Sequence, residues 1–438
     1  MNQLKWTNWS QSFQSFPETI EFPSSETDLV ALVNTSNKNS SKIKIIGSGH
    51  SCSLIAETHE GTLISLQNYN KILSYDKDRY LLKVQSGISL KAIGLFLDKN
   101  NAALSNLGTI DPQSIAGAIS TGTHGTGLKF GAMDQQIEAL EIITADGEIM
   151  TASNSQNREL FLAARVGLGA LGIISTVTLK AVPKYNLEVQ TKTVSFDEML
   201  TSIPLIHTTD FLRFWWVPHT DKVQLWQADK TEQTITKTNR LKDWIQGILF
   251  GNIVHEIGLW LTSFYPKKIP TLNRWMYRLL FEKEQQLIGN SKDLFVLPIH
   301  VKQSVMEYGI PIEHTQKAIS EIRTLLQTKN LKVHMPIELR FTPENDAFLS
   351  MAYKRTTCYI GIISYKPFGK DIPHDSYFEQ VHTILKKYEG RPHWAKKHFY
   401  TPETLETCYP EWHTFKQLKN NLDPKGMFEN NFLKSYFS

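Results

Sequence analysis

Apolar and polar positions switch between helix-like and strand-like spacings along residues 1–180 of the chain. Ser25 to Asp28 form a capping sequence ahead of Leu29, Leu32 and Val33, and a second helix is predicted over 89–100. Apolar, β-branched runs predict strands at 42–46, 61–66, 81–84, 137–144 and 173–179. The N-terminal region is therefore expected to alternate helices and strands.

A domain boundary is predicted near residue 184, because Val182-Pro183 interrupts this alternation. Beyond it the predicted strands and helices are longer, which indicates a second domain over 185–400. The last stretch, 401–438, contains a helix-like segment followed by Asp423-Pro424. A chain of 438 residues is too long for one simple core, so two or three domains are expected.

The charge of the chain is nearly balanced, with 47 basic and 43 acidic residues and a formal net charge of +4. This excess is too small to indicate nucleic-acid binding, which requires a concentrated basic face. Three cysteines without C-x-x-C spacing argue against a disulfide framework or zinc site and favour a reducing, cytoplasmic compartment. The 14 histidines form no helical zinc motif, so no metal site is predicted.

One apolar segment, 244–264, bears on membrane binding. Gln246, Asn252, His255 and Glu256 interrupt it, so it lacks the ~20 consecutive apolar residues that cross a bilayer. A buried or amphipathic helix is the favoured interpretation. Weak association with a membrane surface is the alternative.

Residues 167–172 read Gly-Leu-Gly-Ala-Leu-Gly, which matches the G-x-G-x-x-G string of dinucleotide-binding Rossmann units. In such a unit the string follows a strand and opens a helix, whose N-terminus receives the pyrophosphate. Here the order is reversed, because 158–166 is predicted as a helix and 173–179 as a strand. A nicotinamide-binding Rossmann domain is therefore disfavoured.

Two other glycine-rich segments have the composition of anion-binding loops. Residues 47–51, Gly-Ser-Gly-His-Ser, follow a predicted strand, and the glycines allow a tight turn that presents consecutive N–H groups. Residues 114–127 mix small polar residues with buried-type isoleucines and alanines, which suits a backbone lying against a flat ligand better than a flexible linker. Together they predict one large phosphate-bearing cofactor. For His50, the residues alone leave open a surface imidazole or a hydrogen bond to phosphate.

These segments, taken with strings further along the chain, resemble the vanillyl-alcohol-oxidase type of FAD-binding protein, and most closely the aldonolactone oxidoreductases. The strings are Leu107-Gly108-Thr109, Met306-Glu307-Tyr308-Gly309-Ile310-Pro311, Glu338-Leu339-Arg340-Phe341 and Arg391-Pro392-His393-Trp394-Ala395-Lys396. The H-W-A-K at 393–396 is typical of lactone-oxidising members, whereas alditol oxidases more often carry H-W-G-K.

The resemblance implies an α+β fold of two domains. A FAD-binding domain would occupy 1–184, and a substrate domain carrying a large antiparallel sheet would occupy 185–400. The C-terminal segment, 401–438, would return to the FAD-binding domain.

Carried over position by position, the resemblance implies a covalent bond between His50 and the flavin 8α carbon. It implies other FAD contacts from Gly47, Ser48, Gly49, Ser51, Cys52, Gly108, Ser114, Gly117, Thr121, Gly122, Thr123, His124, Gly169, Gly172, Ile174 and His393. It assigns catalysis to Lys396, Arg340 and Glu338, and substrate contacts to the same three with Thr109 and Ser364. Taken alone, Glu338 and Arg340 would more often be a surface salt bridge.

Oxidation of a hydroxyl group requires a hydride acceptor, a partner for the developing alkoxide, and positive charge near the reduced flavin. The expected activity is FAD-dependent oxidation of a sugar-1,4-lactone of the gulono-, galactono- or arabinono-lactone type, with O2 as acceptor and H2O2 as product. Three alternatives stay open: an oxidase of xylitol- or sorbitol-like alditols, a dehydrogenase using another acceptor, and a flavin-binding protein without catalysis.

Overall fold

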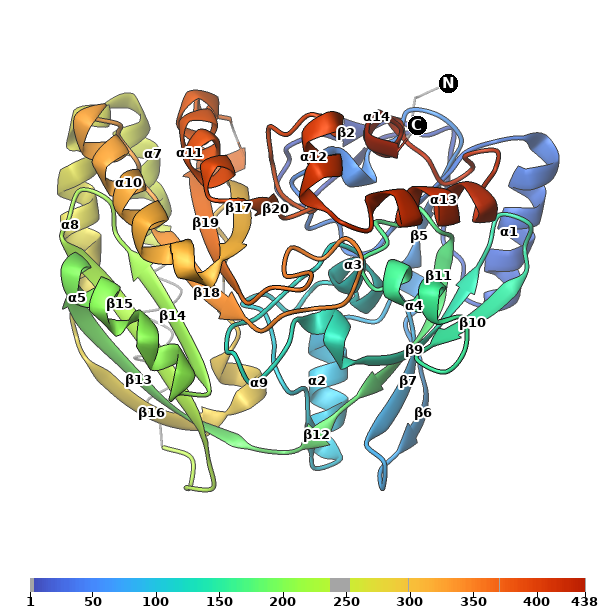
Figure 1. Cartoon of the computed structure of the whole chain (residues 1–438), viewed down its shortest axis with the longest axis horizontal. Coiled ribbons are helices and arrows are strands. Elements are labelled where there is room, and N and C mark those ends of the chain that lie inside the picture. Colours follow the sequence, from blue (N-terminus) through green and yellow to red (C-terminus); the bar gives the residue numbers. More distant parts are fainter. Residues whose placement is uncertain (1–3, 237–252, 298, 370, 438) are drawn as a thin grey trace.

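The computed structural model describes residues 4–236, 253–297, 299–369 and 371–437, which form two regions built on different sheets (Figure 1). The N-terminal region holds a three-stranded parallel sheet and a five-stranded antiparallel sheet. The second region is built on one antiparallel sheet of eight strands, called the large sheet below. The α+β fold expected from the sequence, with a large antiparallel sheet in the second region, is confirmed.

The five strands predicted in the N-terminal region are present, each to within one residue at each end. In the parallel sheet, β5 (Thr62–Ser65) lies between β3 (Thr19–Glu21) and β4 (Ile43–Ile46). The five-stranded sheet runs in the order β10 (Ile149–Ser153), β9 (Ile137–Ile143), β11 (Ile173–Lys180), β7 (Leu81–Gln85) and β6 (Ile72–Asp76). Of the strands in these two sheets, β3, β6 and β10 were not predicted. Two short pairs join β1 (Trp6–Thr7) to β2 (Gln14–Ser15) and β8 (Ala102–Ala103) to β12 (Val182–Pro183).

The helices of this region are α1 (Glu26–Asn39), α2 (Leu90–Lys99), α3 (Ile115–Ser120) and α4 (Arg158–Ala164). The predicted cap starts α1, because the Ser25 hydroxyl accepts a hydrogen bond from the Asp28 N–H and the Asp28 carboxylate accepts one from the Ser25 N–H. Helix α1 then buries Leu29 and Val33 in a core shared with the parallel sheet.

The large sheet runs in the order β16 (Gln285–Asn290), β13 (Asn186–Ser195), β15 (Lys222–Thr231), β14 (Phe211–Trp216), β18 (Ile337–Thr342), β19 (Thr357–Tyr365), β17 (Gln303–Pro311) and β20 (Arg391–Pro392). Because side chains alternate along a strand and paired residues share a face, its register sorts the residues into two faces. One face carries Leu339, Phe214 and Ile360. The other carries Glu307, Glu338 and Arg340 and meets the N-terminal region.

The remaining helices surround the large sheet and close the chain. Those of the second region are α5 (Phe196–Ser202), α7 (His255–Phe264), α8 (Ile269–Leu280), α9 (Ser291–Leu294), α10 (Thr315–Thr328) and α11 (Asp375–Lys387). The C-terminal helices α12 (Pro402–Cys408), α13 (Trp412–Leu422) and α14 (Asn431–Phe437) lie over the N-terminal region (Figure 1). There the Asn430 amide donates to the carbonyl oxygens of Leu54, Ile55 and Glu57.

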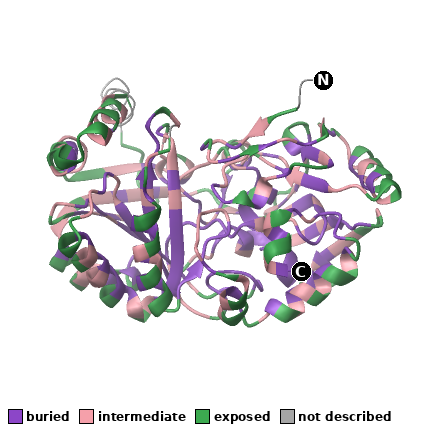
Figure 2. Cartoon of the chain, turned by 90° about the horizontal axis from the view of Figure 1, so that it is seen from above, coloured by how far each residue is buried: buried purple, intermediate pink, exposed green. Residues whose placement is uncertain are grey.

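Buried residues run from the strands of the large sheet into the N-terminal region, and exposed residues lie on the outer helices (Figure 2). Across the described ranges, no helix is both long and apolar enough to span a bilayer. Residues 244–252 of the apolar segment singled out in the sequence lie outside the described residues. Its remainder forms α7, in which Leu259 is buried while Trp260 and Phe264 are exposed.

Candidate functional site

The two glycine-rich loops lie against each other. A side chain at Gly47 would collide with the Ser114 hydroxyl, only 1.8 Å from the Cβ position, so the loops approach more closely than any other residue would allow. Gly49 has φ +67, and a Cβ there would strike the Trp6 ring at 2.8 Å. Ser114 also caps α3, since its hydroxyl accepts a hydrogen bond from the Gly117 N–H. Segments that are distant in sequence thus form one surface.

The loop that follows His50 is tied to the 393–396 string. The Cys52 and Ser53 N–H groups donate to the Ala395 carbonyl oxygen at 2.6 and 3.2 Å, and the Ser53 hydroxyl donates to the Trp394 carbonyl at 2.6 Å. The His50 turn therefore has a fixed relation to Lys396. Because the Cys52 N–H is used in this contact, it is not available to a cofactor phosphate.

The 167–172 string lies between α4 and β11, in the helix-to-strand order that the sequence indicated. Gly169 has φ +69, and a Cβ there would meet nothing within 4 Å. Gly172 is different, because a Cβ there would lie 2.5 Å from the Ile143 carbonyl oxygen. Gly172 is thus required by backbone packing, whereas Gly169 faces open space. Ile174, in β11, pairs with Ile142.

Most other predicted cofactor residues line the same two loops. Gly108 approaches the 124 backbone, because a Cβ there would lie 3.4 Å from the His124 carbonyl oxygen, and Gly122 has φ +73. Several hydroxyls are engaged within the protein: Ser48 donates to the Pro112 carbonyl, Thr121 donates to the Gly117 carbonyl, and Thr123 accepts from the Gln113 amide. The Ser51 carbonyl accepts from the Asn8 amide.

Glu338 and Arg340 form a buried ion pair on the large sheet. The Arg340 Nη2 donates to Glu338 Oε2 at 2.5 Å and to the Thr109 hydroxyl at 3.2 Å, while the Trp215 indole N–H donates to Glu338 Oε1 at 2.7 Å. Burial alone would raise the pKa of Glu338, but the charge and hydrogen bond of Arg340 outweigh it and lower the pKa. Both side chains are therefore charged, and the structure brings Thr109, which was predicted to contact substrate, to Arg340.

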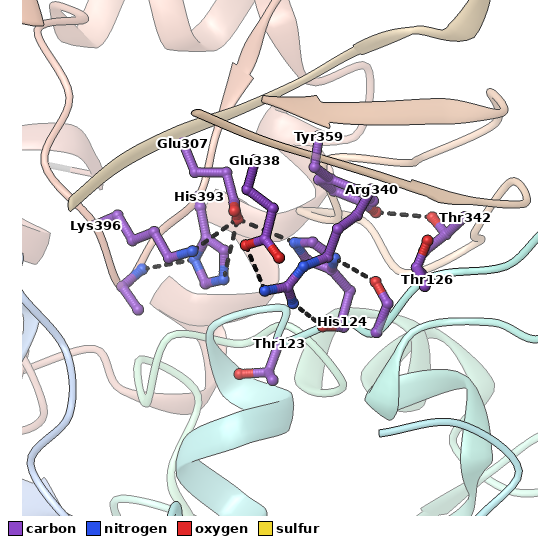
Figure 3. A network of polar contacts seen from close by, with 12 residues as sticks. Thr123, His124, Thr126, Glu307, Glu338, Arg340, Thr342, Tyr359, His393 and Lys396 are labelled. Atoms are coloured by element: carbon purple, nitrogen blue, oxygen red, sulfur yellow. Dashed lines mark hydrogen bonds and ion pairs between the residues drawn. The ribbon is translucent and has the colours of Figure 1, made fainter. Parts of the chain in front are cut away.

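A second acidic residue, Glu307 on β17, lies on the same face and organises three other side chains (Figure 3). Its Oε1 lies 2.9 Å from Lys396 Nζ, 3.0 Å from His124 Nε2 and 4.0 Å from His393 Nε2. His393 Nδ1 accepts a hydrogen bond from the Ala395 N–H. Burial and the Lys396 charge hold the pKa of His393 well below its usual value, so this ring is neutral.

His124 does not point at the glycine-rich loops. Its ring contacts Glu307 and stacks on Tyr359 with a centroid separation of 3.5 Å. The predicted position of His124 along the cofactor phosphates thus stays a prediction for its backbone segment alone. Its imidazole instead joins that segment to the large sheet.

Ser364 lies away from this cluster. Gly361 is the cross-strand partner of Glu338 and of Glu307, and Ser364, three residues further along β19, falls on the opposite face. The structure therefore does not bring Ser364 to Glu338 and Arg340, because its side chain lies on the other face of the sheet.

Sequence analysis missed three residues of the site: Glu307 as a network centre, Trp215 and Arg213. Burial lowers the pKa of Arg213 to about 10, and its guanidinium lies over the Trp215 and Trp226 rings at 5.0 and 4.4 Å. The sequence did contain a signal, because Arg213 and Glu307 are each the single charged residue of a largely apolar strand. A charge in such a position must be buried and paired.

Among the described residues, one group has ligand atoms close enough for a metal ion: His124, Glu307 and His393, all within 4.8 Å of one another. The Lys396 ammonium lies 2.9 Å from the shared Glu307 oxygen. A cation there would be repelled by this ammonium. The cluster is therefore better described as an ion-pair network than as a metal centre.

The donor set fits a large ligand that supplies hydrogen-bond partners. Within the described ranges, Arg340 Nε and Gln113 Oε1 are buried without a hydrogen-bond partner, one at each side of the 121–124 segment. Buried polar groups of this kind normally have partners. FAD, together with a polar substrate, carries both acceptors and donors. The Gly169 backbone leaves room for close approach, because a Cβ there would meet nothing within 4 Å.

His50 lies at the rim of this surface. Its ring is 5.4 Å from the Trp9 ring, and burial together with the nearby Lys302 charge lowers its pKa. The imidazole is therefore neutral at physiological pH, which is the state that a nucleophilic nitrogen requires.

Comparison with known proteins agrees with this geometry. Residues 17–153 match the FAD-binding domain family model, and residues 177–436 match the model for D-arabinono-1,4-lactone oxidase. The chain is 36% identical to L-gulonolactone oxidase of Bos taurus, covering 99% of this chain and 98% of the relative. It is 33% identical to L-gulono-1,4-lactone dehydrogenase of Mycobacterium tuberculosis, covering 98% of each.

A solved structure shows the same fold. Cholesterol oxidase from B. sterolicum superposes with a TM-score of 0.83 at 16% identity, covering 100% of this chain and 97% of the other. At this identity the likeness concerns the fold alone. The match to the lactone-oxidase model, together with full-length relatives above 30% identity, establishes the family: the chain is a FAD-binding oxidoreductase of the D-arabinono-1,4-lactone oxidase family.

Proposed function

We propose that this protein oxidises a hydroxyl group of a sugar-1,4-lactone of the gulono-, galactono- or arabinono-lactone type. The carrying observation is the buried Glu338–Arg340 pair, held against Thr109 and facing the FAD-binding region. A ring of hydroxyls and a lactone carbonyl presents donors and acceptors that match a carboxylate beside a guanidinium. When bound, FAD supplies the hydride acceptor at its N5 atom.

Each charged side chain has a separate part in the proposed reaction. Glu338 accepts hydrogen bonds from substrate hydroxyls. Its Oε1 accepts from Trp215 and its Oε2 from Arg340, and each oxygen retains a lone pair. Arg340 donates its unpartnered Nε–H to a substrate oxygen. Lys396, a quarter exposed, places positive charge where the hydroxyl oxygen loses its proton.

Anaerobic mixing tests this proposal. The yellow enzyme is combined with gulono-, galactono- and arabinono-lactones and, separately, with xylitol and sorbitol, and absorbance near the flavin maximum is followed. Bleaching by a lactone, and not by the polyols, is expected. Bleaching by the polyols alone would favour an alditol oxidase, and no bleaching by any compound would favour a flavin-binding protein without this activity.

Oxygen is the proposed electron acceptor. The names of the relatives do not decide the acceptor, because the Bos taurus relative is named an oxidase and the Mycobacterium tuberculosis relative a dehydrogenase. Admitting air to the lactone-reduced enzyme is expected to restore the yellow colour within seconds and release H2O2. Reoxidation that requires a quinone or cytochrome would make the protein a dehydrogenase.

A covalent bond from His50 to the flavin 8α carbon is proposed from the neutral imidazole and its position at the loop. Acid precipitation of the wild type should leave yellow colour in the pellet, whereas His50→Ala should release it to the supernatant. His59→Ala, at an exposed histidine nine residues along the chain, is the matched control. A colourless wild-type pellet would refute the bond.

Weak binding to a membrane surface is also proposed, from an apolar patch on α7 and the turn after it. Trp260, Leu261, Phe264 and Tyr265 are 39–68% exposed, and Lys267 and Lys268 follow directly. Aromatic residues beside lysines suit an anionic bilayer surface. Sedimentation with phosphatidylserine-containing vesicles should exceed that with phosphatidylcholine alone and fall in Trp260→Ser/Phe264→Ser. Equal sedimentation of wild type and variant would refute it.

A further inference from the structure

Glu307 is the most enclosed charge in the site, with only 2% of its surface exposed. Its neighbours along β17, Met306 and Tyr308, point to the opposite, apolar face, so the carboxylate is the only part of this strand segment that enters the network. The same oxygen, Oε1, serves Lys396 at 2.9 Å and His124 at 3.0 Å. These partners come from two distant segments, the C-terminal H-W-A-K string and the second glycine-rich loop.

His124 is held in place by contacts at both ring nitrogens. Nδ1 lies 3.0 Å from the Gly125 carbonyl oxygen, and Nε2 lies 3.0 Å from Glu307 Oε1. The ring thus ties Glu307 to the backbone of the second glycine-rich loop. The stacked Tyr359 ring holds the plane of the imidazole.

Glu307 is ionised despite its burial. Burial alone would raise its pKa, but the charges of Lys396 and His124 outweigh that effect and hold the pKa well below its usual value. The other titratable groups around it are His393, which is neutral, and Arg340, whose pKa is raised partly by Glu307. Two more lie close by, Tyr359 and Cys358, and burial raises both of their pKa values.

We propose that Glu307 is a positioning residue of the active site: its single oxygen fixes the Lys396 ammonium against the His124 segment of the FAD-binding region. A lysine side chain has four rotatable bonds, and without an anchor its ammonium would sample many positions. Catalysis by a charged group depends on that group being held in place before reaction. This inference rests on the proposed function, because it takes Lys396 as the cation used in lactone oxidation.

Gly361 supports this assignment independently. It faces both Glu307 and Glu338 across the sheet, and a Cβ there would lie 3.1 Å from Glu307 Oε2. β19, the strand between the two acids, thus has a glycine where a side chain would displace the Glu307 carboxylate. The sheet therefore leaves space for this carboxylate.

The test uses the flavin-loaded enzyme with Glu307→Gln, which keeps the shape and removes the charge. We expect kcat for the lactone to fall about 10- to 100-fold while KM stays within about twofold, because the Glu338–Arg340–Thr109 contacts are untouched. Glu307→Asp, which keeps the charge, should recover part of kcat. The matched control is Glu321→Gln, since Glu321 pairs with Lys387 at 2.8 Å on the outer helices and its loss should leave kcat unchanged.

Two comparisons separate positioning from a merely structural role. Loosening of the sheet would disturb the Glu338–Arg340–Thr109 contacts and change KM together with kcat, whereas loss of the anchor for Lys396 should change kcat alone. Recovery of part of kcat in Glu307→Asp would show that the carboxylate charge, and not only the shape of the side chain, is needed.

The outcomes are distinct. Unchanged kcat in Glu307→Gln, with a wild type that oxidises lactones, would overturn the inference and leave the proposed function intact. A fall in kcat with an equal rise in KM, and no recovery in Glu307→Asp, would also overturn it, because it would show a structural role. A wild type that bleaches with no lactone would instead remove the proposed function.

Discussion

Two buried acids on one face of the large sheet, Glu338 and Glu307, are partnered in different ways. Glu338 is held mainly by its own sheet, through Arg340 two residues along β18 and Trp215 on the adjacent β14. Glu307 is held by groups from outside the sheet, Lys396 and His124. The Glu338 cluster is thus set once the sheet forms. The Glu307 network is complete only when the two regions are docked.

This difference explains how one face can serve two tasks. A cluster made within a sheet has a fixed geometry and suits recognition of a polar substrate. A network that crosses between regions places a cation relative to the cofactor-binding segment. Gly361 lies between them and keeps the two carboxylates apart without filling the space.

The largest effect is expected from breaking the Glu338 cluster. Arg340→Ala should lower kcat/KM about 10²- to 10³-fold, because it removes the cation proposed to contact substrate and leaves Glu338 buried without its closest counter-ion. Steady-state kinetics with the preferred lactone measure this. Arg323→Ala, at a guanidinium on α10 that pairs with Asp197 and Asp221, is the control. A loss below about tenfold would show that Arg340 isn't a substrate contact.

Adding a methyl group between Glu307 and Glu338 should have the next largest effect. Gly361→Ala places a methyl group 3.1 Å from Glu307 Oε2, so the carboxylate must shift by a few tenths of an ångström. We expect kcat to fall about tenfold with KM little changed, since Lys396 moves and Arg340 does not. Gly94→Ala, whose Cβ would meet only Lys292 at 3.8 Å, should be neutral. An unchanged kcat in Gly361→Ala would contradict the positioning argument.

Removing one hydrogen bond from Glu338 should have a smaller effect. Trp215→Phe deletes the indole N–H that donates to Glu338 Oε1 at 2.7 Å and leaves Arg340 in place. A bond of this type contributes about 1 kcal/mol, so kcat/KM should fall about fivefold, mainly through KM. A change in kcat alone would instead connect Trp215 with the Glu307 network.

The smallest expected effect concerns the loss of folding stability in acid, to which Glu307 and Glu338 should contribute differently. Both have folded-state pKa values below the ordinary 4.5, so the stability that they contribute is present above pH 4.5 and lost as pH falls below it. The Glu307 pKa is lowered further, so Glu307→Gln should flatten the fall in Tm between pH 5 and 3 more than Glu338→Gln. Thermal melts across this range measure it. The reverse order would show that Glu338 has the stronger counter-ions.

Much of the fold could be predicted from the sequence. Local spacing predicted the capped α1, the strands β4, β5, β7, β9 and β11, and the helix-to-strand order around 167–172. All of these are present in the structure. Glu338, Arg340, Thr109 and Lys396 came from resemblance, and the structure brings the first three into direct contact. The domain boundaries near 184 and 400 and the covalent bond at His50 stay predictions.

Other site residues could not be assigned from the sequence, because their roles depend on contacts between segments that are distant in the chain. Ser364 falls on the wrong face of β19 because the register of the sheet decides orientation. A glycine is required at position 172 because the Ile143 carbonyl oxygen leaves no space for a side chain. The Cys52 N–H is unavailable to a cofactor because it donates to the Ala395 carbonyl oxygen. Both partners are distant in sequence. Glu307 was quoted only as part of a string, since its partners lie at positions 124 and 396.

By itself, the sequence determined where several helices and strands form, because short-range spacing and glycine content control backbone geometry. It also predicted that a phosphate-bearing cofactor meets the 47–51 and 114–127 loops. The tertiary structure alone decided that Glu307, not only Glu338, organises the site. A buried charge is stable only beside opposite charges, and those charges reach it from other segments through folding.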